Sequence, residues 1–465
     1  MQTPPPTTQI DAAVGPPPHS WTLADIAPEQ APVYVAEVHL DEPLAPMGGC
    51  GARSTSRVWM LVRLHTHPLG HVGIDVPRFG LSSEHVAQAI WACLGNRIAS
   101  HLESDDVSPA GGIPADGLKA RSRPHCLSGR TAVMASAPSV SIVIATKDRT
   151  ESLDRCLSSL QTLNYPDFEV LVVDSAPQSD ETALLVQQRR GVLPSLRYLR
   201  VGRPGLAVAH NAAMPEARGD LLAFTDDDVV VDRHWLAALA EGFSVAPDVG
   251  CVTGLIAPAE LETPAQLWVE QYGGFCKGFE RSVFGLQVSF SKDRLFPYSA
   301  GRFGSGANMA FRSTTLRAMG GFDPALGAGT KARGGDDLAG FLQVLRLGER
   351  LVYEPGAIVR HWHRREYDAL RRTAHGYGVG LGAYLSSAVA REPHLLLDFA
   401  KKLPEGLAHL RGEDSPKNSN KAVDFPAELE TLERVGLVRG PFAYAHSRWR
   451  DRRTRVRRGE TVMHG

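Results

Sequence analysis

Asp220-Leu-Leu-Ala-Phe-Thr-Asp-Asp-Asp-Val229 is the stretch of sequence that decides the fold. Its apolar part predicts a short buried strand, and three carboxylates follow at the carboxyl end of that strand. Ligand sites of open α/β sheets lie at this edge. Asp226 and Asp228 are two residues apart on an extended segment and point to the same side, where we expect them to bind one hard divalent cation, Mg²⁺ or Mn²⁺.

A solvated acidic turn is the alternative interpretation of the same residues. Aspartates are common in turns, and here they would cap a helix that begins near Asp232. The apolar strand before the turn favours the ligand site, as do the other segments that converge on it.

Strand and helix patterns alternate four times around this stretch. The predicted strands are 141–145, 168–174, 196–201 and 221–226, and the predicted helices are 150–163, 178–190 and 205–217. The short connections between them predict a mostly parallel, doubly wound α/β sheet. Thr146, Asp174 and Asp226 end three of the strands, so we expect them to line one crevice, and together they indicate a nucleotide site.

The size and composition of the chain limit its domain number and its partners. At 465 residues, it is expected to form two or three domains. A formal net charge of −1 gives no basic field, so nucleic acid is not an expected partner. Neither a signal peptide nor a membrane span is predicted, and the six scattered cysteines indicate a reducing compartment. We therefore expect a cytoplasmic protein, at most attached to the inner face of a membrane.

Changes in composition predict the domain boundaries. The predicted segments are a disordered Pro-rich segment (1–30), a small α+β domain (31–105), a linker (106–138), the α/β domain (139–366) and a helical extension (367–465). The extension ends in a basic tail, for which a solvated helix is the ordinary interpretation and peripheral contact with anionic lipid headgroups is the alternative. Its arginines are Arg448, Arg450, Arg452, Arg453, Arg455, Arg457 and Arg458.

Three histidines in the small domain, His65, His67 and His71, alternate after a predicted strand. They offer no evident acidic partner nearby. A solvated strand end is therefore a better interpretation than a metal site.

Two later segments complete the predicted site. The glycines of 304–311 allow the backbone to approach a ligand closely. Asp336 and Asp337 open a helix after a glycine pair, where they either compensate the helix dipole or provide a general base. His361 and His363 follow a strand, and neutral imidazole is a suitable ligand for a Mn²⁺-like metal.

Residues 139 to about 365 resemble the family 2 glycosyltransferases of the GT-A fold. Five elements occur in the order of that family: Ser141-Ile-Val-Ile-Ala-Thr-Lys-Asp-Arg149, Leu171-Val-Val-Asp174, Phe224-Thr-Asp-Asp-Asp228, the segment 304–311 followed by Gly320-Gly-Phe-Asp323, and the pair Asp336–Asp337. The resemblance implies a GT-A type mixed sheet with a Rossmann-like nucleotide half. It also implies inverting transfer of a sugar from a nucleoside diphosphate sugar to a hydroxyl of a glycan, lipid-linked or small-molecule acceptor.

The resemblance also implies the roles of individual residues. Asp226 and Asp228 would hold the metal on the diphosphate, with His361 a better third ligand than His363. Asp337 matches the general base, and Asp336 is a candidate to share that role. The implied donor-site residues are Ala145, Thr146, Arg149, Asp174, Gly205, Asn211 and Asp227, and those around the acceptor and donor sugar are Gly306, Asn308 and Phe322.

The sequence departs from the family pattern at several positions. Ala145 and Lys147 stand where Pro and Tyr are common, and the acidic pair is Asp-Asp rather than Glu-Asp. His210 stands where an Arg is usual, which would make one phosphate contact weaker or pH-dependent. Two other functions stay open: a sugar nucleotidyltransferase, disfavoured because 146–151 contains no glycine, and a catalytically inactive carbohydrate- or nucleotide-binding scaffold.

Overall fold

In the computed structural model, the chain divides into two compact units. The structure describes residues 19–48, 55–107, 111–120, 123–193, 195–272, 274–288, 293–411, 421 and 424–457. The first unit comprises Met1–Thr22, Ala36–His65 and Leu69–His125, and the second comprises Leu23–Val35, Thr66–Pro68 and Cys126–Gly465.

Two segments that the sequence assigned to disorder or to a linker contain regular structure. Residues 1–18 lie outside the described residues, but 19–30 include β1 (Ser20–Trp21), η1 (Leu23–Asp25) and η2 (Pro28–Gln30). Folded structure therefore begins earlier than predicted. The predicted linker holds η3 (His125–Leu127) and α2 (Ser128–Ala135). Arg130 anchors α2 through an ion pair of 3.0 Å with Glu241.

The first unit is built on a four-stranded sheet in the order β1-β4-β3-β2, with one helix packed on it. Its further elements are β2 (Val33–His39), β3 (Thr55–Leu64), β4 (His67–Pro77) and α1 (Ser83–Ser104). The hydroxyl of Ser82 caps α1 by accepting a hydrogen bond from the His85 N–H at 3.4 Å. His67 and His71 lie within β4, and not beyond the end of a strand as predicted.

The second unit contains a nine-stranded mixed sheet in the order β11-β13-β10-β12-β8-β5-β6-β7, with β9 paired to β13. Pairing is parallel through β8, β5, β6 and β7, and β12 then joins β8 antiparallel. The strands are β5 (Val140–Thr146), β6 (Phe168–Ser175), β7 (Leu196–Val201), β8 (Leu221–Asp226), β9 (Val229–Val231), β10 (Val249–Pro258), β11 (Ser282–Phe284), β12 (Asn308–Arg312) and β13 (Arg350–His361).

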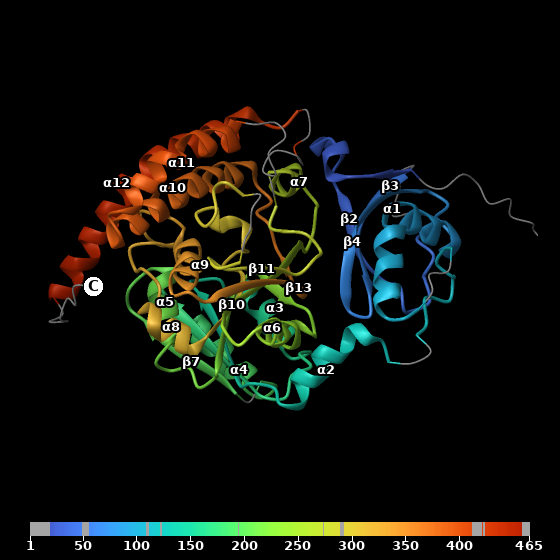
Figure 1. Ribbon diagram of the computed structural model, residues 1–465, viewed down its shortest axis with the longest axis horizontal. Coiled ribbons are helices and arrows are strands. Elements are labelled where there is room, and N and C mark those ends of the chain that lie inside the picture. Colours follow the sequence, from blue (N-terminus) through green and yellow to red (C-terminus); the bar gives the residue numbers. More distant parts are fainter. Residues whose placement is uncertain are drawn as a thin grey trace, which may run out of the picture. The chain divides into compact units, whose positions relative to one another are not determined.

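Helices cover both faces of this sheet (Figure 1). Ile142 and Ile144 of β5 pack with α3, α4 and α6, whereas Val143 between them packs with α5, α8 and α9. This alternation follows from the period of two in a strand. The helices are α3 (Thr150–Leu160), α4 (Glu181–Arg189), α5 (Leu206–Ala213), α6 (Trp235–Phe243), α7 (Pro264–Gln271), α8 (Ser313–Met319) and α9 (Asp336–Arg346).

The predicted helical extension consists of α10 (Tyr367–Arg391), α11 (Leu395–Arg411) and α12 (Ala427–Arg457), of which α10 and α12 lie side by side (Figure 1). Each helix has two glycines four residues apart that face the backbone of the other helix and allow close approach: Gly378 and Gly382 on α10, and Gly436 and Gly440 on α12. A Cβ at Gly378 would lie 1.9 Å from the carbonyl oxygen of Glu433, and one at Gly440 would lie 2.6 Å from the Ala383 nitrogen. The predicted fold class is therefore confirmed: a doubly wound mixed α/β sheet with a small N-terminal α+β unit and a helical C-terminal region.

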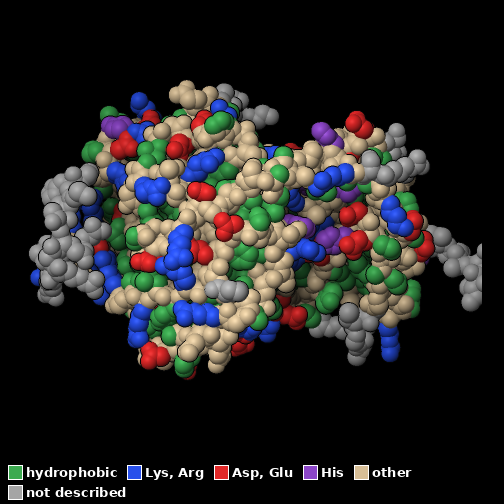
Figure 2. All heavy atoms as spheres, turned by 90° about the horizontal axis from the view of Figure 1, so that it is seen from below, with side chains coloured by type: hydrophobic (Ala, Val, Ile, Leu, Met, Phe, Trp, Pro, Cys, Tyr) green, Lys and Arg blue, Asp and Glu red, His purple; other side chains and the backbone are tan. Residues whose placement is uncertain are grey.

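The exposed face in Figure 2 carries interspersed acidic and basic side chains among the described residues, in keeping with the net charge of −1. Within the ranges that the structure describes, none of the helices combines the length and apolar character needed to cross a membrane. Arg458 of the basic tail lies outside these ranges.

Candidate active site

The turn after β8 gathers the acidic residues and a histidine at one edge of the sheet. β8 lies between β5 and β12, and its residues from Leu221 to Phe224 are buried. The chain reverses after Asp226, so that Val229 of β9 pairs with His361 at the end of β13. The Trp362 N–H donates to the Asp228 carbonyl at 3.0 Å, which fixes this crossing. Backbone pairing thus brings together residues far apart in the sequence.

Asp226, Asp228 and His361 form a cluster with the donor set of a divalent cation site. Their ligand atoms all lie within 4.8 Å of one another. The two oxygens of Asp228 are divided between partners: Oδ1 lies 3.3 Å from His361 Nε2, and Oδ2 accepts from Arg149 at 2.7 Å. Carboxylate and imidazole together suit Mn²⁺-like metals.

The electrostatics of this cluster also fit a cation. Burial, together with the charge of Asp228, raises the pKa of Asp226 well above its ordinary value. Burial also acts to raise the pKa of Asp228, but the hydrogen bond and charge of His361, with Arg149, hold it below its ordinary value. A divalent cation at this point would favour the ionised form of Asp226, because it offsets the repulsion between the two carboxylates.

Two buried residues, His363 and Glu270, orient the His361 ring through a chain of contacts. Its Nδ1 lies 3.1 Å from His363 Nδ1, and His363 Nε2 lies 2.6 Å from Glu270 Oε1. Both His363 and Glu270 are buried. His363 is therefore engaged with Glu270, while the Nε2 of His361 faces Asp228. Partners of this kind fix the tautomer and direction of a ligating imidazole.

Asp227 is not one of the three clustered residues; its carboxylate holds the loop after β5. It accepts from the Thr146 hydroxyl at 2.7 Å and from Arg149 Nη1 at 2.5 Å. Burial raises the pKa of Asp227 to about 6, against the opposing charge of Arg149. Arg149 thus joins the loop after β5 to both Asp227 and Asp228.

The two aspartates at the start of α9 differ in environment. Asp336 is buried beside Gly327, and burial together with Asp337 raises its pKa to about 7. Asp337 is half-buried; its Oδ2 accepts from the Gly306 N–H at 2.9 Å and its Oδ1 from the Leu338 N–H at 2.8 Å. Burial raises the pKa of Asp337 as well. Of the two, Asp337 is the more accessible carboxylate.

These groups line one cavity of about 1660 Å³ within the second unit. That volume exceeds the roughly 300–1,000 Å³ of an ordinary small-ligand pocket and is sufficient for two substrates. The predicted site residues on its wall are Ala145, Thr146, Arg149, Gly205, Asp226, Asp227, Asp228, Gly306, Asp336, Asp337 and His361. Four other predicted site residues are absent from the wall: Asp174, Asn211, Asn308 and Phe322.

Three of these four support the backbone or other side chains. Asn211 exchanges two hydrogen bonds with the backbone of Phe322, at 2.7 and 2.8 Å. Asn308 is fully buried, donates to the carbonyls of Leu255 and Ala357, and accepts from Trp235. Asp174 accepts from the Tyr198 hydroxyl at 2.8 Å, while its neighbour Ser175 reaches the cavity.

His210 does not act as the pH-dependent phosphate contact suggested by the sequence. Its ring is buried, with centroids 4.8 Å from Phe224 and 5.3 Å from Phe322. Burial lowers the pKa of His210 to about 3, so the ring is neutral near pH 7.

Sequence reasoning missed several polar residues on or behind the cavity wall. Lys277 and Tyr377 line the cavity, and Glu270 holds His363 behind it. Burial lowers the pKa of Lys277, and the charge of Asp337 opposes that shift. None of the three lies in a recognisable local motif: Glu270 is on α7, Lys277 is in the segment after α7, and Tyr377 is on α10.

An α/β sheet with a carboxylate–histidine cluster at the end of a central strand defines a ligand site at the carboxyl edge. Residues 141–318 match the sequence model of glycosyl transferase family 2. The pre-mycofactocin glycosyltransferase of Mycobacterium tuberculosis is 29% identical over 231 residues, covering 49% of this chain and 43% of the relative. The uncharacterized protein y4gI of Sinorhizobium fredii is 34% identical over 122 residues, covering 26% of this chain and 13% of the relative. The chain thus spans less than half of either relative.

Among solved structures, the chain is similar to that of a mannosyltransferase, PcManGT from Pyrobaculum calidifontis in complex with GDP-Man and Mn²⁺. Its identity to this chain is 19% and its TM-score 0.41, covering 69% of this chain and 81% of that chain.

Proposed function

We propose that this chain is an inverting, metal-assisted glycosyltransferase of the GT-A type, which moves a sugar from a nucleoside diphosphate sugar to an acceptor hydroxyl. One observation carries the proposal. Asp226, Asp228 and His361 cluster within 4.8 Å on the wall of a large cavity whose wall also holds Asp337. The family match of residues 141–318 supports it.

The donor side consists of the cluster and the loop after β5. A divalent cation, Mn²⁺ or Mg²⁺, would neutralise the charge that develops on the leaving diphosphate. Asp228 is suited to bind this cation, because its Oδ1 faces His361 while its Oδ2 is held by Arg149. The Arg149–Asp227–Thr146 contacts would keep the nucleotide loop in place.

The acceptor side centres on Asp337, the proposed general base. Backbone N–H groups of Gly306 and Leu338 orient its carboxylate, and burial raises its pKa toward the range where a base is effective. Asp336 is a weaker candidate, because its side chain is more buried than that of Asp337. Attack from the side opposite the diphosphate would invert the sugar carbon.

Loss of the acidic turn or of the proposed base would favour the inactive-scaffold alternative, and the chain retains Asp226, Asp228 and Asp337. A nucleotidyltransferase would need a glycine-rich phosphate loop after β5. Residues 146–151 occupy that position in this chain, and they contain no glycine. The acceptor class stays open among glycan, lipid-linked and small-molecule acceptors. Contact of the basic tail with anionic membrane stays a prediction, for which liposome flotation with and without residues 448–465 is the test.

Thermal shifts with UDP, GDP, CDP and dTDP, each with and without Mn²⁺, test the donor site, because a ligand of the native state raises its melting temperature. One diphosphate is expected to give a Mn²⁺-dependent shift. Asp228→Ala should abolish that shift, whereas Asp337→Asn should keep it and lose sugar transfer by about 10²-fold or more. Equal loss of donor binding in both variants would refute the separation of metal ligand from base.

A further inference from the structure

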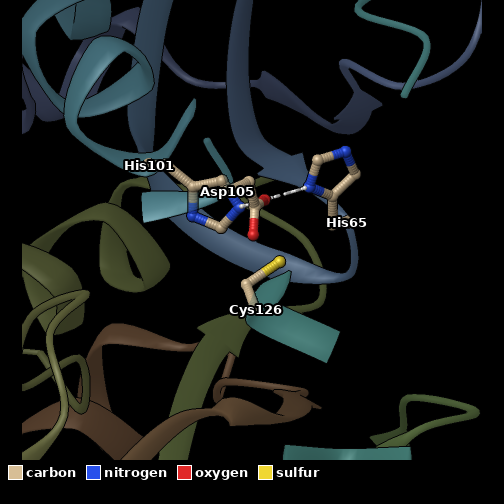
Figure 3. Close-up of side chains that lie close together, drawn as sticks. All are labelled: His65, His101, Asp105 and Cys126. Carbon is tan, nitrogen blue, oxygen red and sulfur yellow. Dashed lines mark hydrogen bonds and ion pairs between the residues drawn. The ribbon is translucent and has the colours of Figure 1, made fainter. Parts of the chain in front are cut away.

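A second cluster of metal-ligating side chains lies in the first unit. His65, His101 and Asp105 come together there (Figure 3). Their side chains are 4%, 13% and 1% exposed, respectively. His65 stands in the turn between β3 and β4, and the other two stand at the carboxyl end of α1. The proposed glycosyltransferase function uses none of them.

The local structure of α1 places two of these residues on one face. His101 and Asp105 are four residues apart, so their side chains project from the same side of the helix end. In Figure 3 the two imidazole rings lie on either side of the Asp105 carboxylate. The third residue arrives from the hairpin, where His65 has a φ of 49° and the following Thr66 a φ of 71°. Positive φ at both residues is the conformation of the type I′ turn that joins adjacent antiparallel strands, and this turn fixes the direction from which His65 approaches.

The distances between the three ligand atoms match one face of a metal coordination tetrahedron. Asp105 Oδ2 lies 2.9 Å from His65 Nδ1 and 3.5 Å from His101 Nε2, and the two nitrogens are 3.4 Å apart. Ligands about 2.05 Å from a tetrahedral Zn²⁺ are separated from one another by roughly 3.4 Å. The two distances from His101 Nε2, to Asp105 Oδ2 and to His65 Nδ1, agree with that value. The distance between His65 Nδ1 and Asp105 Oδ2 is shorter and corresponds to a hydrogen bond.

The position of Asp105 makes a cation more favourable still. A helix carboxyl end has negative electrostatic potential, so a buried carboxylate there is repelled by the helix dipole. A hydrogen-bonded His–Asp–His cluster without metal is the competing interpretation.

We infer that His65, His101 and Asp105 form a binding site for a Zn²⁺-type divalent metal, which links the β3–β4 turn to the carboxyl end of α1. Two imidazoles and one carboxylate are the ligand types of mononuclear zinc sites. The site does not depend on the proposed function, and it differs in donor set from the carboxylate-rich cluster at Asp226.

The experiment uses the full chain carrying Asp228→Ala, so that the cluster after β8 does not contribute to metal binding. The protein is treated with a chelator, dialysed, loaded with Zn²⁺ and analysed for bound metal, and affinity is measured by competition with a chromogenic chelator. We expect one tightly held Zn²⁺ per chain. In parallel, Co²⁺ should give the visible absorption of a four-coordinate site with nitrogen and oxygen ligands.

Near-isosteric variants identify the ligands while preserving the fold. His65→Gln, His101→Gln and Asp105→Asn should each weaken Zn²⁺ binding by more than about tenfold, because each removes a direct ligand. His85→Gln is the matched control, since His85 lies on α1 at the opposite end from His101. Circular dichroism before metal addition checks that each variant is folded.

The inference is overturned if the Asp228→Ala chain retains no stoichiometric Zn²⁺, or if the three variants bind it as tightly as His85→Gln. Either result would mean that the three residues form only a hydrogen-bonded cluster. Neither result would affect the Mn²⁺-dependent nucleotide shift of the wild-type chain, so the two proposals fail separately.

Discussion

Asp336→Asn is expected to change stability in a strongly pH-dependent way. The folded chain raises the pKa of this carboxyl from 3.8 to about 7, chiefly through burial. The folded state therefore holds the proton more tightly than the unfolded chain, and the stability of the wild type falls as pH rises from about 4 to about 7. One pKa unit corresponds to about 1.4 kcal/mol, so the loss approaches roughly 4 kcal/mol above pH 7.

Asn is neutral at every pH and retains one acceptor oxygen, so the variant avoids this loss. Its advantage over the wild type should be near zero at pH 4 and greatest above pH 7. The value of about 4 kcal/mol is an upper limit, because the neighbouring Asp337 contributes to the shift. Melting temperatures measured in half-unit steps from pH 4.5 to 8.5 give the profile.

Asp180→Asn is the control for removing a charge, because Asp180 has a side chain 73% exposed. Its difference from the wild type should change little with pH. If Asp336→Asn shows a constant difference across the same range, or destabilises the chain most at high pH, then Asp336 is not the buried acid that the structure describes.

Two further perturbations test the surroundings of the proposed active site. Glu270→Gln removes the carboxylate that contacts His363 and should weaken Mn²⁺-dependent donor binding by about 10–100-fold, as measured by titration calorimetry. Glu262→Gln is the control. Unchanged affinity in Glu270→Gln would contradict the role of His363 and Glu270 in orienting His361. His210→Phe replaces a buried ring between Phe224 and Phe322. It should leave the pH–rate profile between pH 6 and 8 unchanged, and a shifted profile would show that the imidazole reaches the substrate.

Local sequence patterns were sufficient to predict the strands that form the centre of the second unit. β8 and its carboxylates could be predicted because an apolar run and an acidic turn are adjacent in the chain. The fold class could be predicted for the same reason, since strand and helix alternate with short connections. β4 was missed because its histidines interrupt the apolar pattern.

The direction and partners of polar side chains could not be predicted in this way. Asn211 and Asn308 are implied by resemblance to contact substrates, yet both are engaged in hydrogen bonds away from the cavity wall. The search for an acidic partner of His65 failed because Asp105 is 40 residues away in the sequence. Only the packing of α1 against the sheet brings the two together.

The close packing of α10 on α12 has a consequence for the order in which the cavity forms. Both helices contribute to its wall, through Tyr377 and Gly380 on α10 and Glu433 and Leu437 on α12. During synthesis the sheet with its carboxylate turn emerges from the ribosome long before α12 does. A chain truncated just after α10 is therefore expected to bind nucleotide at the proposed donor site while the wall contributed by α12 is missing.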